Sequence, residues 1–224
     1  MNQYLSMFNL SKFESIQFSF PDLKIDNLLR AQGYRKNHNV RQVIRNAAFK
    51  SIERLREASA PQGFFFFEQI KTLKGNHLTL GSGIEFDCPV FEEILGGSTH
   101  LISFILTLGK ETDEKIASYA KDLDEPLASL FLETAAWLCL ELVMKKARIY
   151  LTEFAVLNGM KLGKRMAPGY SYKIKKTNSR IIWNLSEQTK LFKMFKDFEI
   201  SVKLLESSAM IPRMSRSGIF GVKS

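Results

Sequence analysis

Apolar residues along this chain recur with two different periods, which divide the sequence into expected strands and helices. Segments with alternating or continuous apolar positions predict strands. One of them contains four consecutive phenylalanines, Phe64 to Phe67, which must point to both sides of a sheet, so we expect both faces to be covered. The expected strands are residues 14–20, 64–73, 77–80, 84–86, 100–108, 160–164, 200–204 and 217–222. The run at 100–108 is the expected centre of a sheet that also includes 200–204.

Apolar positions three and four residues apart predict the helices. Residues 40–60 give the clearest amphipathic pattern, and a longer helix is expected from Pro126 to about Ala155. Shorter helices are expected at 26–33, 90–95, just after Asp113, and at 186–196. We find no internal repeat and no linker, so residues 1–224 are expected to form one domain of mixed helices and strands.

Glu133 is the unusual residue in the first half of the long helix, because it lies among apolar neighbours such as Phe131 and Leu132. A carboxylate buried in such surroundings needs a partner. One reading pairs it with an arginine or lysine of the protein. The other turns it toward the ammonium or ribose of a ligand.

Composition narrows the class of protein. Hydrophobic residues make up 45% of the 224, which is enough for a substantial core. The two cysteines, Cys88 and Cys139, have no paired or metal-ligand spacing, which indicates a reducing compartment. Neither a signal peptide nor a membrane-spanning run is predicted, so we expect a cytoplasmic protein. No zinc-type spacing links the three histidines, and no metal site is predicted.

The net charge of +9 is concentrated in one stretch. Residues 155–186 hold no acidic residue and seven cations: Lys161, Lys164, Arg165, Lys173, Lys175, Lys176 and Arg180. This confinement favours a basic loop beside an anion or an acidic partner. Aromatic residues nearby leave single-stranded nucleic acid as a less favoured alternative.

Four short blocks follow one another in the last third of the chain. They are Arg165–Tyr170 (RMAPGY), a WNLSEQ run from Trp183, an LESSAMIP run from Leu205, and an SRSG run from Ser215. Within the first, Pro168 and Gly169 predict a turn that exposes main-chain groups. Arg165 offers a fork of donors suited to a carboxylate, and Tyr170 offers an apolar face with a polar tip. For an isolated block of this kind, an ordinary surface turn is the alternative.

The four blocks, in this order, resemble the S-adenosylmethionine-binding activation domain of cobalamin-dependent methionine synthase. Two earlier strings, LLRAQGYR from Leu28 and TLGKETD from Thr107, resemble stand-alone relatives of that domain. The resemblance implies an α+β fold with an antiparallel sheet and packed helices. It also implies S-adenosylmethionine as the ligand, and cobalamin only through a partner protein. That partner is expected to be a corrinoid-binding protein or a split methionine synthase subunit.

The resemblance also suggests how the ligand is held. We expect Arg165 to pair with the carboxylate of S-adenosylmethionine, and backbone groups at Ala167 and Gly169 to contact the adenine or ribose. Tyr170 is expected to cover the ligand, and Glu133 to offset its positive charge. No catalytic residue is assigned.

The chain departs from the family in ways that open a second hypothesis. It has no cobalamin-ligating D-x-H-x-x-G motif and no folate or homocysteine module, so it cannot catalyse methionine synthesis alone. The acidic residues that the family places in a D-W-x-P setting and just before the turn have no counterpart here. The alternative function is therefore a partner-binding or scaffold protein of the same fold that has lost ligand binding.

Overall fold

An antiparallel sheet of seven strands organises the computed structural model, which describes residues 12–34, 40–121, 126–174 and 178–223. The sheet runs in the order β4 (Glu85–Asp87), β3 (His77–Leu80), β2 (Gln62–Lys74), β5 (His100–Thr107), β11 (Ser215–Lys223) and β6 (Lys161–Met166), and β1 (Lys12–Gln17) pairs with β2. Every pairing in it is antiparallel. As predicted, the strand that begins at His100 is central, and all eight of its residues are buried.

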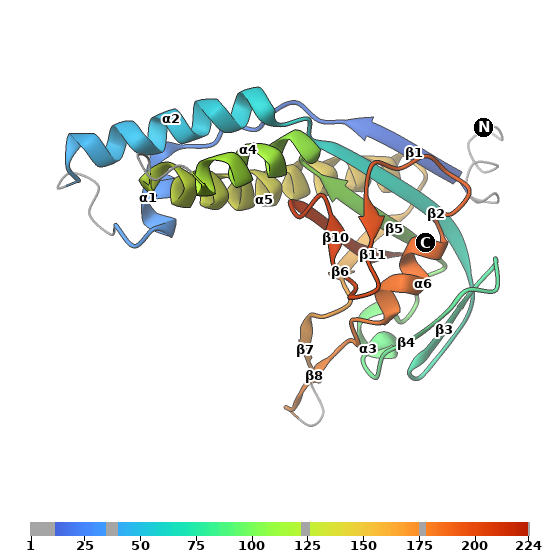
Figure 1. Cartoon of the computed structure of the whole chain (residues 1–224). Helices are drawn as coiled ribbons and strands as arrows, with labels where there is room; N and C mark the ends of the chain where they lie inside the picture. The colour runs from blue at the N-terminus through green and yellow to red at the C-terminus, as the bar shows by residue number, and fades with distance from the viewer. Residues whose placement is uncertain (1–11, 35–39, 122–125, 175–177, 224) are drawn as a thin grey trace.

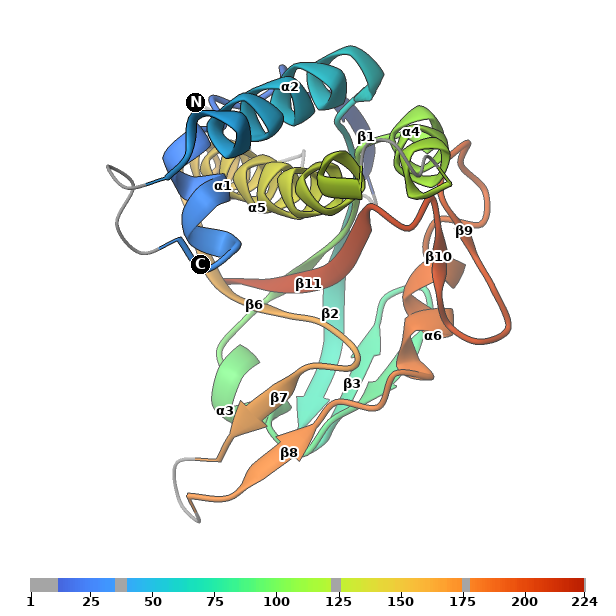
Figure 2. The same cartoon turned by 60° about the vertical axis from the view of Figure 1, so that its left-hand side comes forward.

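Helices cover both faces of this sheet (Figures 1 and 2). On one face lie α1 (Ile25–Ala31), α2 (Gln42–Ala58), α4 (Lys110–Ala120) and α5 (Pro126–Leu157). On the other lie α3 (Phe91–Leu95) and α6 (Glu187–Lys193). The predicted α+β class, with an antiparallel sheet and packed helices, is confirmed.

The four phenylalanines of β2 show why both faces needed cover. Phe65 and Phe67 belong to the core beneath the long helices, whereas Phe64 and Phe66 belong to the core on the opposite face. Each of the four exposes 8% of its surface or less. Replacing one of them with alanine would cost about 3–5 kcal/mol, because the cavity adds to the lost transfer free energy.

Helix α5 forms the centre of the helical layer. Its length and apolar composition would suffice to cross a membrane, and a buried core helix passes the same test. Leu132, Ala136, Leu140 and Val143 are buried against the sheet and α2, so its apolar character is accounted for by the core. Cys139 lies on this buried side, and Cys88 is buried on the other face of the sheet, both as free thiols.

The prediction that residues 200–204 join the main sheet is wrong. Only Lys203–Leu204 is extended (β9), and it pairs with β10 (Met210–Ile211) in a separate two-stranded sheet. Both neighbours of β11 are already in place, since β5 and β6 flank it. Val202 is buried in the core on the α6 face, which accounts for the apolar pattern without a place in the main sheet.

The basic stretch after Tyr170, predicted as a loop, instead forms a projecting hairpin. β7 (Ser171–Lys173) and β8 (Arg180–Ile182) pair with each other in a third sheet. Figure 1 shows this hairpin extending away from the helical layer. Lys175 and Lys176 lie outside the described residues.

Candidate functional site

One cleft of about 390 Å³ collects residues from all four sequence blocks. The first block contributes Pro168, Gly169 and Tyr170, and the second contributes Leu185 and Gln188. Ser208, Ala209 and Met210 come from the third, and Ser215, Arg216 and Ser217 come from the fourth. Trp137 of α5 and Arg213 complete the lining. The four blocks, spread over residues 165–218, therefore meet at a single place.

The turn at Pro168 and Gly169, which lines the cleft, is held in place by hydrogen bonds to the main chain of Trp183. The Gly169 amide donates a hydrogen bond to the Trp183 carbonyl (2.7 Å), and the Trp183 amide donates to the Tyr170 carbonyl (3.0 Å). Trp183 is fully buried, with its ring edge-on to Phe86 and Phe91. Gly169 has a φ of 81°, a conformation that strongly favours glycine. The first and second blocks thus form one rigid unit.

Ala167 is held by a tyrosine of the hairpin. Its amide donates to the Tyr172 hydroxyl at 2.7 Å, and that hydroxyl donates back to the Ala167 carbonyl at 3.1 Å. Burial raises the pKa of Tyr172, so the hydroxyl keeps the proton that it donates. The main-chain groups expected to meet a ligand at Ala167 are therefore paired within the protein in this structure.

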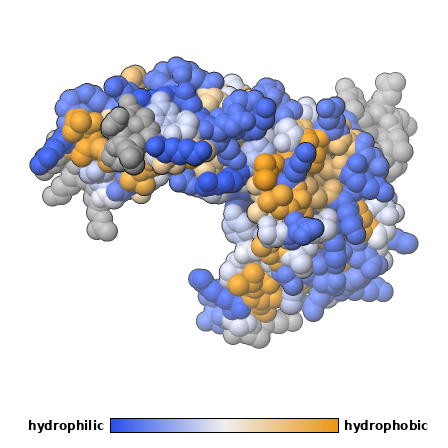
Figure 3. All heavy atoms as spheres, in the orientation of Figure 1, coloured by the Kyte–Doolittle hydropathy of each residue, from blue (hydrophilic) through white to orange (hydrophobic). Residues whose placement is uncertain are grey.

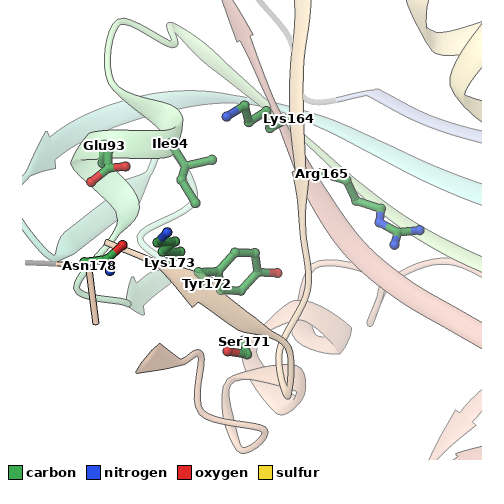
Figure 4. A pocket seen from close by; sticks show the side chains of 8 residues that line it. All are labelled: Glu93, Ile94, Lys164, Arg165, Ser171, Tyr172, Lys173 and Asn178. Carbon is green, nitrogen blue, oxygen red and sulfur yellow. The ribbon is translucent and has the colours of Figure 1, made fainter. Parts of the chain in front are cut away.

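Arg165 lies beside the cleft and does not line it. Its guanidinium carbon is 5.8 Å from the centre of the Tyr170 ring, a cation–π distance. Arg165 also borders a second cavity of about 520 Å³ near the hairpin, together with Lys164, Tyr172 and Lys173. Figure 4 shows the side chain of Arg165 on the opposite side of β6 from that of Lys164. Tyr170 thus links the guanidinium to the cleft.

Glu133 is half-exposed, contrary to the buried position predicted for it. Its carboxylate accepts a hydrogen bond from the Arg213 guanidinium at 2.7 Å, so the reading with a protein partner describes this structure. One turn further along α5 comes Trp137, and one more turn brings Glu141, which pairs with Arg216 at 2.6 Å. Two ion pairs therefore bracket the exposed indole on the same side of the helix.

Asp113 holds the chain that carries Arg213. Its carboxylate accepts hydrogen bonds from the main-chain amides of Arg213 and Met214, the latter at 3.2 Å. The Ser215 hydroxyl donates to the Thr107 hydroxyl at 2.9 Å. The block that begins at Thr107 thus supports the fourth block, a role that the spacing of the residues did not reveal.

Among the cleft residues to which sequence reasoning gave no role are Trp137, Gln188, Arg213 and Arg216. Gln188 stands inside the second block, so the block itself was a signal for it. Trp137 was visible only as one more apolar residue of a buried helix, although 43% of its surface is exposed. Arg216 stands inside the fourth block, whereas Arg213 lies between two blocks and gave no pattern, because its position depends on its contact with Glu133 of α5.

The face around the cleft is apolar and hollowed. Two exposed apolar side chains, Tyr170 and Leu185, line the cleft, and the neighbouring segments of the same chain region expose Ile182, Leu205 and Ile211. Figure 3 shows apolar surface over the region of β10 and on the hairpin, with a hollow between the helical layer and the hairpin. A patch of this kind on a protein surface marks an interaction site.

Comparison with known proteins gives a match of fold. A crystal structure described as the MetH reactivation domain bound to AdoHcy superposes with a TM-score of 0.59 over 94% of this chain and 78% of that chain, at 15% sequence identity. No protein-family sequence profile matches the chain. No curated protein sequence matches it either. The chain therefore has the fold of the reactivation domain.

Proposed function

We propose that this chain binds S-adenosylmethionine in the cleft and acts with a cobalamin-dependent methionine synthase or a related corrinoid protein. The observation that carries the proposal is the convergence of the four blocks on one cleft. The blocks were selected from the sequence alone, and nothing in their spacing required the first two to meet the last two. The shared fold with a domain whose structure is described as bound to AdoHcy supports the same ligand class.

The contacts follow from the chemistry of the lining. Arg165 holds the amino-acid carboxylate of the ligand through its two-pronged donor, at the edge of the cleft where Tyr170 stands. Tyr170, 44% exposed, covers the bound molecule with its ring. Gly169 lines the cleft, and Ala167, which precedes Pro168, lies just outside the lining. Because the Ala167 amide is already bonded to Tyr172, its ligand contact requires the hairpin to shift.

The positive sulfonium needs a carboxylate, and we assign this role to Glu133, whose partner Arg213 lines the cleft. Arg213 repels a cationic ligand as long as its guanidinium stays in place. The exchange of Arg213 for the ligand as the partner of Glu133 is therefore part of the proposed binding step.

The proposed partner is a corrinoid-binding protein, which would bring the cobalamin that this chain does not ligate. The hairpin and β6 present Lys164, Lys173 and Arg180 as exposed cations. Such a surface attracts an acidic partner and speeds the encounter. In this role the chain is an accessory to methyl transfer or to reductive reactivation of the cobalamin, and not a complete enzyme.

A second candidate function is that of a partner-binding protein of the same fold without the small ligand. Two observations favour it: the Ala167 amide is already bonded within the chain, and two arginines line a cleft that should accept a cation. The apolar patch and the basic hairpin would serve this function equally well.

Filling the cleft separates the two functions. Ala209 is exposed and lines the cleft, so Ala209→Trp places a large ring inside it without disturbing the core. Ser207→Trp, two residues away and outside the lining, is the matched control. Calorimetric titration with S-adenosylmethionine should show binding to the wild type and the control, and little to Ala209→Trp. Equal binding by all three would place the ligand elsewhere.

A further inference from the structure

Gln188 is a buried polar residue whose role the fold does not explain. It exposes 4% of its surface, and its side-chain nitrogen has no hydrogen-bond partner among the described residues. Buried amide groups in proteins are almost always paired. The residue nevertheless lines the cleft, so a small rotation of its side chain offers the amide to a bound molecule.

The neighbouring Glu187 shows the contrast. Its carboxylate accepts a hydrogen bond from the Asp87 main-chain amide at 2.9 Å and pairs with Lys190 at 2.7 Å. Glu187 is thus fully engaged in attaching α6 to β4. Gln188 follows Glu187 on the same helix, but its side-chain nitrogen makes no comparable hydrogen bond among the described residues.

Trp137 contributes a flat surface to the same cleft. It is 43% exposed, whereas the other tryptophan of the chain, Trp183, is completely buried. The ion pairs of Glu133 with Arg213 and of Glu141 with Arg216 stand one helical turn to either side of it. An exposed indole fixed in a cleft is suited to stacking on a flat heterocycle.

We propose that Gln188 is a specificity-determining residue that reads the adenine edge of the ligand while Trp137 stacks on its ring. This inference rests on the proposed function and names how the site recognises the base. A carboxamide carries a donor beside an acceptor, and this pair matches the 6-amino group and N7 of adenine. Hypoxanthine presents two acceptors at that edge, so the same amide fits it poorly.

The test compares two probes, S-adenosylhomocysteine and its analogue with hypoxanthine in place of adenine. The wild type should prefer the adenine compound by about tenfold or more, and Gln188→Leu should lose that preference along with roughly ten- to a hundredfold in affinity for it. Gln188→Met keeps the length of the side chain but removes both the donor and the acceptor, and it serves as the second variant, with the same loss of preference expected. Melting temperature should not fall in Gln188→Leu, because an unpaired amide is replaced by an apolar group.

Tryptophan fluorescence gives an independent readout of the stacking. The adenine compound should change the emission of the wild type, and Trp137→Phe, which retains Trp183, should abolish the change.

If the wild type binds the adenine compound but the Gln188 variants keep its preference, the role of Gln188 is overturned and the proposed function stands. If the wild type binds neither probe at millimolar concentration, both are overturned.

Discussion

Arg213 and Glu133, 80 positions apart in the sequence, form an ion pair of 2.7 Å at the edge of the cleft. Both side chains are well exposed, at 65% and 41%, so the pair contributes little to the stability of the fold. Its importance is electrostatic: the guanidinium neutralises the carboxylate that a cationic ligand would use.

Removing Arg213 should therefore improve the binding of the cationic ligand. We expect Arg213→Ala to raise affinity for S-adenosylmethionine about twofold to fivefold, since an exposed pair is screened by solvent. Glu133→Gln should lower it by a similar factor. S-adenosylhomocysteine, whose sulfur is neutral, is the matched control, and its affinity should change much less in both variants. Equal changes for the two compounds, measured by calorimetry, would contradict a charge-based role.

Tyr172 should be important for stability through its bonds to Ala167. Tyr172→Phe leaves the buried Ala167 amide without a partner, which should cost about 1–3 kcal/mol. For a domain of this size, each kcal/mol corresponds to a fall of roughly 2–4 °C in melting temperature. Tyr170→Phe makes the same chemical change at an exposed position and should leave the melting temperature nearly unchanged.

Stability should decline in alkaline solution because of Cys139. Burial raises the pKa of its thiol from 9.0 to about 12. Between these values the unfolded chain has lost the proton and the folded chain has kept it, so the stabilisation is complete below pH 9 and lost as the pH rises toward 12. The loss is on the order of a few kcal/mol. Cys139→Ala should flatten the dependence of unfolding free energy on pH over this range; an unchanged slope would show that the thiol is not responsible.

The basic surface formed by β6 and the hairpin should control association with a corrinoid-binding partner. Lys164→Glu and Lys173→Glu together should weaken capture of the cobalamin-binding domain of a methionine synthase at low salt, because attraction to an acidic surface is lost. Lys50→Glu, an exposed lysine on α2, is the charge control. If capture of the partner is unchanged in the Lys164→Glu, Lys173→Glu variant and does not depend on salt concentration, this docking face is refuted.

The spacing of apolar residues along the sequence was sufficient to predict the main helices and strands. The continuous apolar run at His100 and the phenylalanines from Phe64 to Phe67 could only belong to strands covered on both sides, and the structure places them in β5 and β2. Residues 200–204 show a case in which the spacing of apolar residues gave a wrong prediction. Val202 is apolar because it enters the core, and the extended residues that follow it, Lys203 and Leu204, pair with β10 and not with an edge of the main sheet.

The cleft was predictable only in part. The turn at Pro168 and Gly169 was visible because proline and glycine constrain the backbone locally. The environment of Glu133 was not, because its neighbours in the sequence lie around a helix and its true partner, Arg213, comes from a distant loop. Trp137 illustrates the same limit, since no local pattern distinguishes an exposed apolar residue of this helix from its buried neighbours.

The most direct test is a titration of wild type, Arg165→Ala and Arg180→Ala with S-adenosylmethionine, alongside their melting curves. Arg180 is an exposed arginine on β8, outside the cleft, so it controls for the loss of one positive charge. Loss of a two-pronged charged contact should cost about 1.5–3 kcal/mol, or roughly ten- to a hundredfold in affinity. We predict that loss for Arg165→Ala alone, with all three melting temperatures alike. A wild type that binds no S-adenosylmethionine at millimolar concentration would contradict ligand binding and leave only the fold.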